Sequence, residues 1–413
     1  MPRPGGRARG RYPRGVTSPQ RAPGGFPVVG IVGGGQLARM CAAPAAELAI
    51  SLSVLAEAPD AAAAQVIPSA PVGDHTDLDA VLAFARECDV VTFDHEHVPS
   101  DVLAALVAEG IPVHPTPEAL RFAQDKLAMR ERLTEIGVAC PAWARARTAD
   151  EVEAFASRVG WPVVAKTPRG GYDGKGVRVV GSVAEVRDWL EAVGTEGPLA
   201  DGLLLEEKVD FVRELAVLIA RSPSNQAAAW PVVETVQTDG ICTEVLAPAP
   251  DLDPTLAAVA TEAGLRIAEQ LGVTGVFAVE MFEVRDAGSG AAAYVVNELA
   301  MRPHNSGHWS MDGAVTGQFE QHLRAVLDLP LGAPTPREPH TVMANVLGGD
   351  YPELYPAYRH VMARDPGVKV HLYGKGVRPG RKIGHVNVSG TDLAQLRERA
   401  GHAADYLAGV ITE

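Results

Sequence analysis

The sequence lacks any apolar run long enough to cross a membrane. A bilayer-spanning helix needs roughly 20 consecutive and mostly apolar residues. Although 46% of the 413 residues are hydrophobic, runs such as Val90–Phe93 and Val276–Val279 are bounded at once by polar residues or glycine. We therefore expect a soluble globular protein without a membrane partner, divided into roughly two to four domains.

Cysteine is also scarce. The four cysteines (Cys41, Cys88, Cys140 and Cys242) are widely separated and form no Cys-x-x-Cys pair. Structural zinc sites and disulfide frameworks are both marked by cysteines at characteristic spacings along the chain. The sequence therefore predicts a cytoplasmic protein in a reducing environment, without structural zinc.

The first 25 residues contain no acidic side chain and no apolar segment of a secretory signal. They contain six arginines: Arg3, Arg7, Arg9, Arg11, Arg14 and Arg21. Because so little of this segment can be buried, residues 1–25 are predicted to form a disordered basic extension, with RNA contact as the alternative. Without these six charges the net charge falls from −14 to −20, so the body of the protein is not expected to bind nucleic acid.

Short apolar runs alternate with helical stretches in the first third of the chain. The expected strands are Pro27–Val32, Ile50–Ala56, Asp89–Phe93 and Ile111–His114, and Asp77–Glu87 is a typical helix between them. Such alternation is typical of an open parallel sheet. Residues 26–124 are therefore predicted to form a Rossmann-like α/β domain.

The remainder is predicted to combine smaller α+β units with a mixed sheet. Helical signals over Arg121–Ile136 place a boundary near residue 125. Alternating strands and helices then predict a small α+β lid over residues 125–208. We expect a mixed-sheet catalytic core over 209–335 and a small β-rich segment with a terminal helix over 336–413, giving an α/β and α+β fold overall.

The first predicted strand leads into a glycine-rich turn. Gly33-x-Gly35-x-x-Ala38, with Glu57 farther on, formally matches the dinucleotide-binding fingerprint. An NAD-dependent oxidoreductase or a nucleotide-sensing binding protein is thus one alternative. The simpler interpretation is a tight turn whose helix N-terminus faces some anion.

A second glycine-rich segment, Lys166–Gly176, lies between two predicted strands. It holds Lys166, Arg169, Lys175 and four glycines. Glycines allow backbone N–H groups to approach phosphate oxygens closely. The segment is not a Walker A loop, because Gly176 follows Lys175 where serine or threonine would bind magnesium. A flexible turn with solvated charges is the alternative.

Two acidic residues are predicted to face each other across a hairpin. The strands Gly275–Glu283 and Ala292–Leu299 flank a turn-like segment. If the hairpin is centred near Ser289, Glu280 and Glu298 are opposed, with roughly 4.5–5.5 Å between their Cβ atoms. Opposed carboxylates repel unless a divalent cation lies between them. An exposed polar edge pair is the alternative.

Three further polar clusters could bind ligands. Glu206–Val209 ends a predicted strand at the link between two domains, where ligand crevices are common. Arg302–Trp309 gathers cationic and hydrogen-bonding groups suited to a small anion. Arg378–Lys382 is a basic cluster suited to a phosphate monoester, although solvated charges are an equally simple interpretation.

Taken in order, these motifs resemble those of the ATP-grasp superfamily. From about Phe26 to the C-terminus the chain is similar to the purine-biosynthetic carboxylases of that superfamily, the N5-carboxyaminoimidazole ribonucleotide synthetases. The motifs are Gly35–Met40, Gly170–Gly176, Asn297-Glu298, Arg302–His308 and Arg378–Lys382. Lys126, Ala38 and Met301 depart from the commoner residues of the family, which are arginine, glycine and proline.

The resemblance implies ATP and Mg²⁺ (or Mn²⁺) as cofactors. The implied ATP contacts are Lys126, Lys166 and a loop that folds over the phosphates, made of Gly171, Tyr172, Asp173, Gly174, Lys175, Gly176 and Val177. The residues implied to frame the adenine are Glu206, Glu207, Lys208 and Val209. Glu214 would contact the ribose, and Gln237 would line the pocket. The implied metal ligands are Glu280, Glu298 and Asn297, and the last two also belong to the ATP site.

The resemblance also implies small-molecule substrates, namely aminoimidazole ribonucleotide and bicarbonate, and a homodimer. The implied substrate contacts are Gln36, Tyr172, Asp173, Arg302, His304, Asn305, Arg378, Arg381 and Lys382, and of these Arg302, His304, Asn305 and Lys382 would be catalytic. The closest alternative is formate-dependent glycinamide ribonucleotide transformylase, which shares the fold and the acyl-phosphate chemistry. The His-Asn-Ser-Gly-His string favours the carboxylase.

Overall fold

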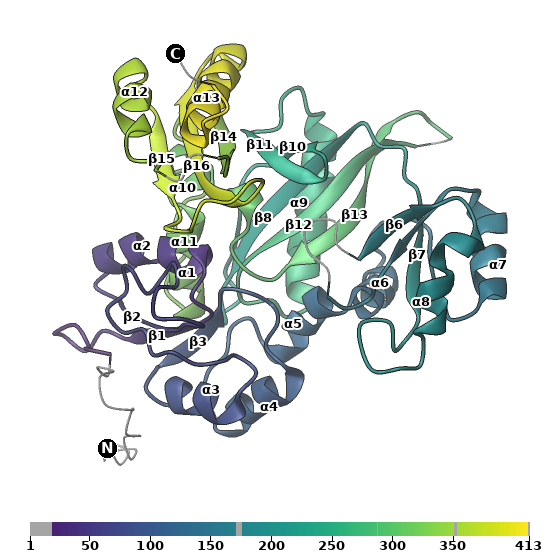
Figure 1. Ribbon diagram of the computed structural model, residues 1–413, viewed down its shortest axis with the longest axis horizontal. Coiled ribbons are helices and arrows are strands. Elements are labelled where there is room, and N and C mark those ends of the chain that lie inside the picture. The colour runs from purple at the N-terminus through teal and green to yellow at the C-terminus, as the bar shows by residue number, and fades with distance from the viewer. Residues whose placement is uncertain (1–18, 171–175, 287, 351–352, 412–413) are drawn as a thin grey trace.

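The computed structural model describes residues 19–170, 176–286, 288–350 and 353–411. Three sheets organise the chain, and each is separate in the ribbon of Figure 1. A three-stranded sheet lies near the N-terminus, a four-stranded sheet follows, and a nine-stranded sheet occupies the centre. Within the described ranges, no helix combines the length and apolarity that crossing a membrane requires.

The N-terminal sheet is parallel, with strand order β2-β1-β3. Its strands are β1 (Val28–Val32), β2 (Ser51–Leu55) and β3 (Val90–Phe93), and its helices are α1 (Gln36–Met40), α2 (Ala42–Glu47), α3 (Leu78–Ala85) and α4 (Ser100–Ala108). The predicted strand Ile111–His114 contributes only an isolated parallel bridge between Val91 and Val113. Arg21 forms an ion pair of 2.5 Å with Asp89, so residues just after the undescribed first 18 contact this sheet.

The helical segment predicted over Arg121–Ile136 is two helices. These are α5 (Pro117–Gln124) and α6 (Lys126–Glu135), and they are separated by Asp125, which has extended backbone angles. The Asp125 carboxylate accepts hydrogen bonds from the first N–H groups of α6. This N-cap starts a new helix at Lys126.

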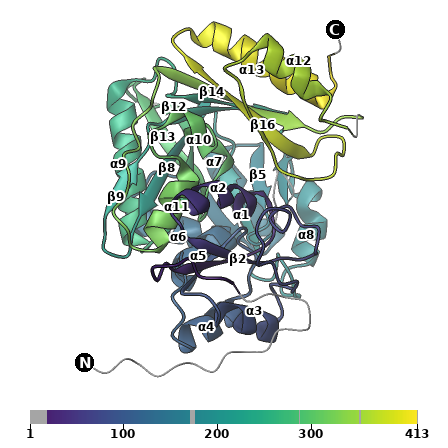
Figure 2. The same ribbon diagram turned by 90° about the vertical axis from the view of Figure 1, so that its left-hand side faces the viewer.

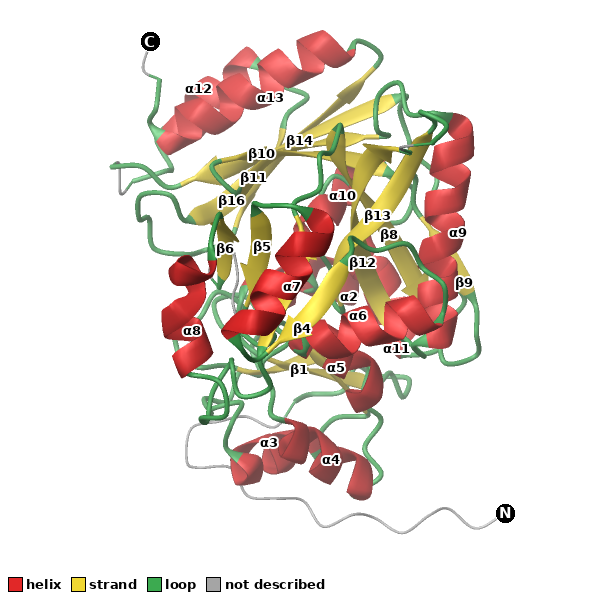
Figure 3. Cartoon of the chain, turned by 90° about the vertical axis from the view of Figure 1, so that its right-hand side faces the viewer, coloured by secondary structure: helices red, strands yellow, loops and turns green. Residues whose placement is uncertain are grey.

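The four-stranded sheet is antiparallel, with strand order β4-β7-β5-β6. Its elements are β4 (Trp143–Ala146), α7 (Ala149–Val159), β5 (Val163–Lys166), β6 (Val177–Val180), η1 (Val183–Val186), α8 (Arg187–Glu191) and β7 (Leu203–Glu207). Helix α7 begins with a capping box made by Thr148 and Glu151. Figure 3 shows α7 in front of the strands of this unit.

The central sheet has the strand order β13-β12-β8-β10-β11-β14-β16-β15, and β9 pairs with β8. Its strands are β8 (Arg213–Arg221), β9 (Ala227–Ala229), β10 (Val233–Thr238), β11 (Ile241–Ala247), β12 (Gly275–Arg285), β13 (Ala292–Ala300), β14 (His340–Leu347), β15 (Lys369–Leu372) and β16 (Lys382–Gly390). The strands expected in a separate C-terminal segment thus extend the sheet of the core.

The helices of this part cover both ends of the central sheet. They are α9 (Pro254–Gln270), η2 (Asn305–Gly307), α10 (Ser310–Gly313), α11 (Gln318–Val326), α12 (Ala357–Arg364) and α13 (Leu393–Ala408). Helix α9 packs on β8, and α13 packs on β14 and β16. Figure 2 shows α12 and α13 together over the β14 and β16 end, with α9 at the other side.

The β12–β13 hairpin contains a β-bulge beside the predicted acidic pair. Arg285 is opposite Ala292, and the register stays constant as far as Met281 opposite Val296. The register then shifts, because Asn297 is an extra residue on β13. As a result Glu280 is opposite Glu298, as predicted.

Candidate active site

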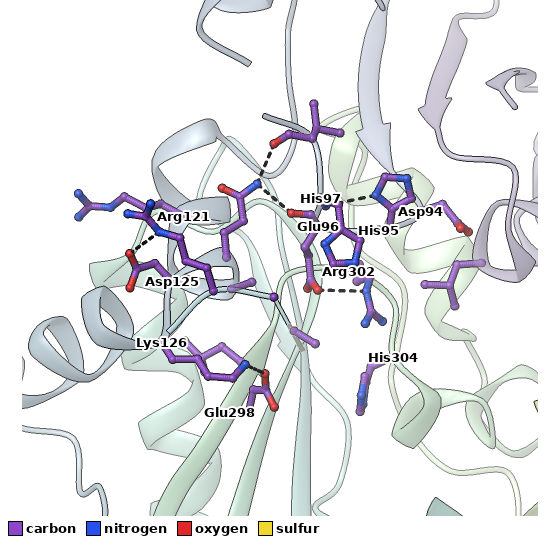
Figure 4. A pocket seen from close by; sticks show the side chains of 18 of the residues that line it. Asp94, His95, Glu96, His97, Arg121, Asp125, Lys126, Glu298, Arg302 and His304 are labelled. Carbon is purple, nitrogen blue, oxygen red and sulfur yellow. Dashed lines mark hydrogen bonds and ion pairs between the residues drawn. The ribbon is translucent and has the colours of Figure 1, made fainter. Parts of the chain in front are cut away.

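The opposed carboxylates of Glu280 and Glu298 each have a basic neighbour. Lys126 Nζ lies 2.5 Å from Glu298 Oε1, and His304 Nε2 lies 3.2 Å from Glu280 Oε1. Figure 4 shows Lys126 and Glu298 pointing toward each other. Burial raises the pKa of Glu280, but His304, Arg302 and Lys382 lower it more, so the pKa is below its ordinary value. Glu280 is therefore held as a carboxylate, and the oxygens of the two opposed side chains suit a hard cation.

A buried ion pair lies beside these carboxylates. Lys166 Nζ is 2.7 Å from Glu206 Oε2 and donates to Asn297 Oδ1 at 3.2 Å. Burial raises the pKa of Glu206, but Arg130 and Lys166 outweigh it and hold the pKa below its ordinary value. Lys166 is thus held at the end of β5 by an ionised acid, directly next to the bulge of β13.

A cavity of about 560 Å³ lies between the four-stranded sheet and the central sheet. Its lining includes Lys166 and Glu206, and Phe211 stacks on Phe282 with ring centroids 4.6 Å apart. Burial and the charge of Glu280 raise the pKa of Glu214 in this cavity to about 7, against a hydrogen bond from Gln237. The cavity thus combines an apolar wall with a few basic and acidic groups, which suits a small ligand that has both a flat apolar part and charged groups.

A second cavity, of about 770 Å³, lies between the N-terminal sheet and the central sheet. The end of β3 contributes Asp94 and Glu96, and Figure 4 shows both in this cavity. Asp94 accepts the Ala38 N–H at 2.7 Å, and burial raises its pKa to about 6. Glu96 Oε2 lies 3.4 Å from Arg302 Nε. Acidic and basic side chains therefore both line the cavity.

The two cavities meet at the acidic pair. Six residues line both of them: Lys126, Glu280, Glu298, His304, Asn305 and Lys382. Ligands in the two cavities would therefore meet at these carboxylates and their basic neighbours. Such an arrangement suits the transfer of a group between two substrates with a divalent cation at the junction.

Models of three protein families match successive parts of the chain. Residues 27–124 match the ribonucleotide synthetase preATP-grasp domain, residues 131–319 match the ATP-grasp domain, and residues 341–399 match the phosphoribosylaminoimidazole carboxylase C-terminal domain. The first matched part contains the N-terminal sheet, and the second contains the strands around the smaller cavity. The third contains the C-terminal strands of the central sheet.

Known proteins are similar over almost the whole chain. The N5-carboxyaminoimidazole ribonucleotide synthase of Mycobacterium tuberculosis is 54% identical over 386 residues, which cover 92% of this chain and 88% of the relative. The chain belongs to the N5-carboxyaminoimidazole ribonucleotide synthase family. It is accordingly an ATP-dependent ligase built on the ATP-grasp fold.

Solved structures of this synthase family share the fold. The enzyme from Thermus thermophilus is 37% identical, with a TM-score of 0.80, and covers 93% of this chain and 99% of its own. The enzyme from Aspergillus clavatus, solved with ADP and 5-aminoimidazole ribonucleotide, is 30% identical, also with a TM-score of 0.80. The match covers 92% of this chain and 98% of the Aspergillus chain.

Most of the residues predicted from the resemblance to the synthase family line the two cavities. The smaller cavity is lined by Lys126, Lys166, Val177, Glu206, Glu207, Lys208, Val209, Glu214, Gln237, Asn297 and Glu298, and the larger by Gln36, Arg302, His304, Asn305 and Lys382. Their individual roles remain predictions.

The other predicted residues are not brought to these cavities. Gly171, Tyr172, Asp173, Gly174 and Lys175 lie outside the described residues. Gly176 directly precedes β6 and lines neither cavity, as the described residues form them. Arg378 and Arg381 are exposed and also line neither of these cavities.

Some residues of the larger cavity were missed in the sequence. Asp94 and Glu96 directly follow β3, and the carboxyl ends of parallel strands commonly form ligand sites, so this signal was present. Lys375 hydrogen-bonds Gln36, which lines the same cavity. No sequence signal connects residues so far apart in the chain.

Proposed function

We propose that the chain carboxylates 5-aminoimidazole ribonucleotide with bicarbonate, forming N5-carboxyaminoimidazole ribonucleotide, ADP and phosphate in purine biosynthesis. The observation that carries the proposal is the meeting of two cavities at the opposed carboxylates of Glu280 and Glu298. The family membership and the relative solved with ADP and 5-aminoimidazole ribonucleotide support ATP for one cavity and the ribonucleotide for the other.

The proposed reaction has two steps. A bicarbonate oxygen attacks the γ-phosphorus of ATP, the bond from that phosphorus to the bridging oxygen breaks, and ADP leaves. The exocyclic amine of the ribonucleotide then attacks the carbon of the resulting carboxyphosphate, or of CO₂ released from it. The carbon–oxygen bond to phosphate breaks, and the amine loses a proton. Phosphorylation thereby turns a poor leaving group into phosphate.

The basic side chains suit these steps. Lys126 and Lys166 face the smaller cavity, where they would bind the phosphates of ATP. Arg302 lies in the larger cavity and offers forked N–H donors to bicarbonate. Because carboxyphosphate reacts with water, the chemistry also requires a site that excludes solvent.

Magnesium or manganese would be held by Glu280, Glu298 and Asn297. Carboxylate and amide oxygens are hard ligands that suit these ions, and the Asn297 Oδ1 atom lies beside Lys166 in the smaller cavity. When bound, the cation would neutralise charge on the phosphates.

The cellular setting and the oligomeric state are further parts of the proposal. A cytoplasmic location is supported by four cysteines that are all free thiols. A homodimer is proposed from the family resemblance alone, and light scattering during size-exclusion chromatography tests it.

The function is tested by measuring ADP release with each candidate substrate set. We expect release to require both 5-aminoimidazole ribonucleotide and bicarbonate. Release with glycinamide ribonucleotide and formate would instead indicate the transformylase, and binding of a nicotinamide cofactor without ATP consumption would indicate the oxidoreductase alternative. Either of those results would overturn the proposal.

A further inference from the structure

Arg130 is a fully buried arginine to which the proposed reaction gives no role. It lies on α6, its exposed fraction is 0%, and it lines neither of the two described cavities. An arginine is rarely buried completely unless its guanidinium is paired. Its partners therefore indicate what it does.

The guanidinium joins the two sheets that enclose the smaller cavity. Arg130 Nε donates to Glu206 Oε1 at 2.6 Å, at the end of β7 in the four-stranded sheet. Its Nη2 donates to the Asn297 carbonyl oxygen at 2.6 Å, on β13 of the central sheet. One rigid planar group therefore fixes the distance between the two walls.

Both partners control side chains at the reaction site. The other oxygen of Glu206 holds Lys166 at 2.7 Å, so the orientation of this carboxylate sets the position of the lysine. Asn297 is the bulge residue that brings Glu298 opposite Glu280. Arg130 thus acts on the phosphate-facing lysine through one contact and on the acidic pair through the other.

Arginine is the side chain that can make both contacts at once. Its N–H groups diverge from a planar fork, whereas the single ammonium of lysine cannot reach a carboxylate and a carbonyl in these directions. We propose that Arg130 is a positioning residue that aligns Lys166 with the Glu280–Glu298 pair across the two sheets. This inference rests on the proposed function only in assigning the smaller cavity to ATP.

The test compares Arg130→Lys with a matched control on the same helix. Arg132 also donates to one carboxylate, that of Glu135 at 3.0 Å, and to one carbonyl, that of Gln270 at 3.1 Å. Neither Arg132 nor these two partners line either cavity. Binding of a non-hydrolysable ATP analogue with magnesium is measured by calorimetry for the wild type, Arg130→Lys and Arg132→Lys. Binding of 5-aminoimidazole ribonucleotide is measured in parallel, with circular dichroism to establish folding.

We expect Arg130→Lys to weaken nucleotide binding by about tenfold or more, because a charge-assisted hydrogen bond to a buried group is lost. Ribonucleotide binding should stay unchanged, and Arg132→Lys should change neither. General loosening of the fold would weaken both ligands together and would overturn the proposal, as would unchanged nucleotide binding in folded Arg130→Lys.

A second variant covers the case in which Arg130→Lys does not fold. Glu206→Asp shortens the acid by one methylene, so it cannot hold Arg130 and Lys166 at their present distances, and the same selective loss is expected. Unaltered nucleotide binding in this variant would overturn the proposal. Failure of the wild type to bind the ribonucleotide would count against the proposed function instead, because the nucleotide titration does not depend on it.

Discussion

Two carboxylates, Glu280 and Glu298, are the side chains on which the proposed chemistry depends most. Lys126 lies 2.5 Å from Glu298, and His304 lies 3.2 Å from Glu280, so each acid is held from a different element. The pair therefore has a fixed geometry in which a cation can bind phosphate oxygens from the smaller cavity.

Glu298→Gln should keep the fold and lose turnover, because glutamine has the same shape but no charge for a cation. We expect the turnover number to fall by about 100-fold or more, the scale of losing one preorganised electrostatic contact. ADP release at saturating magnesium measures it, and Glu262→Gln, at an exposed position on α9, is the control. A rate near that of the wild type would rule out Glu298 as a metal ligand.

Glu214 should make the ligand-free protein less stable as the pH rises. Burial and the charge of Glu280 raise its pKa from 4.5 to about 7, so the folded protein keeps a proton that the unfolded chain releases. Stability conferred by this group is present below about pH 4.5 and is lost as the pH rises to about 7.

Glu214→Gln removes that dependence. The free energy of unfolding of the variant, relative to the wild type, should increase between about pH 5 and about pH 8. Denaturant unfolding without nucleotide or metal measures it. If the two proteins change in parallel with pH, the environment assigned to Glu214 is wrong.

At the scale of elements, the glycine turn between β1 and α1 is built against the end of β3. A Cβ atom on Gly35 would lie 2.0 Å from Asp94 Oδ2 and 2.9 Å from its Cγ. The turn therefore needs glycine because of this close approach, and its next residue, Gln36, lines only the larger cavity.

Gly35→Ala should displace the turn or Asp94 and raise the KM for the ribonucleotide by about tenfold, with little change for ATP. Gly401→Ala, on α13 where the new Cβ meets nothing within 4 Å besides its chain neighbours and its own helix backbone, is the matched control. Steady-state kinetics with each substrate varied in turn measure both constants. Equal effects on the two KM values would show that the turn does not serve the larger cavity alone.

The elements with local signals were predictable, and their irregularities were not. Helix α3 (Leu78–Ala85) lies within the predicted stretch Asp77–Glu87, since the Asp77 side chain caps its first turn. The helix predicted over Arg121–Ile136 was wrong in its continuity, because Asp125 caps a new helix within it. The predicted opposition of Glu280 and Glu298 was confirmed. It depends on a β-bulge at Asn297, however, whereas the prediction assumed a regular hairpin centred on Ser289.

At the scale of the whole molecule, long-range pairing limited what the sequence could predict. Strand β14 pairs with β11 through contacts such as Glu244 opposite Ala344, which merge the C-terminal strands with the core. Likewise, Gln65 donates to the Gly374 carbonyl at 2.8 Å and so fastens the loop of Lys375 beside the N-terminal sheet. Pairings over such separations leave no periodic pattern in the sequence, whereas the ordered motifs did predict the family.

The arrangement of the two cavities makes one claim about the whole molecule. In the proposed reaction, a group from the larger cavity reacts with the γ-phosphate of a nucleotide in the smaller cavity, at the Glu280–Glu298 pair that lines both. One oxygen atom of bicarbonate should therefore end up in the phosphate product. Water should not take the place of bicarbonate as the group that attacks the γ-phosphorus.

The most direct test is a short incubation with ¹⁸O-labelled bicarbonate, ATP and 5-aminoimidazole ribonucleotide, followed by mass analysis of the phosphate. We predict one labelled oxygen in each phosphate formed, because the oxygen that attacks the γ-phosphorus stays with it when the carbon–oxygen bond breaks. Unlabelled phosphate, from bicarbonate that keeps its label, would contradict the account.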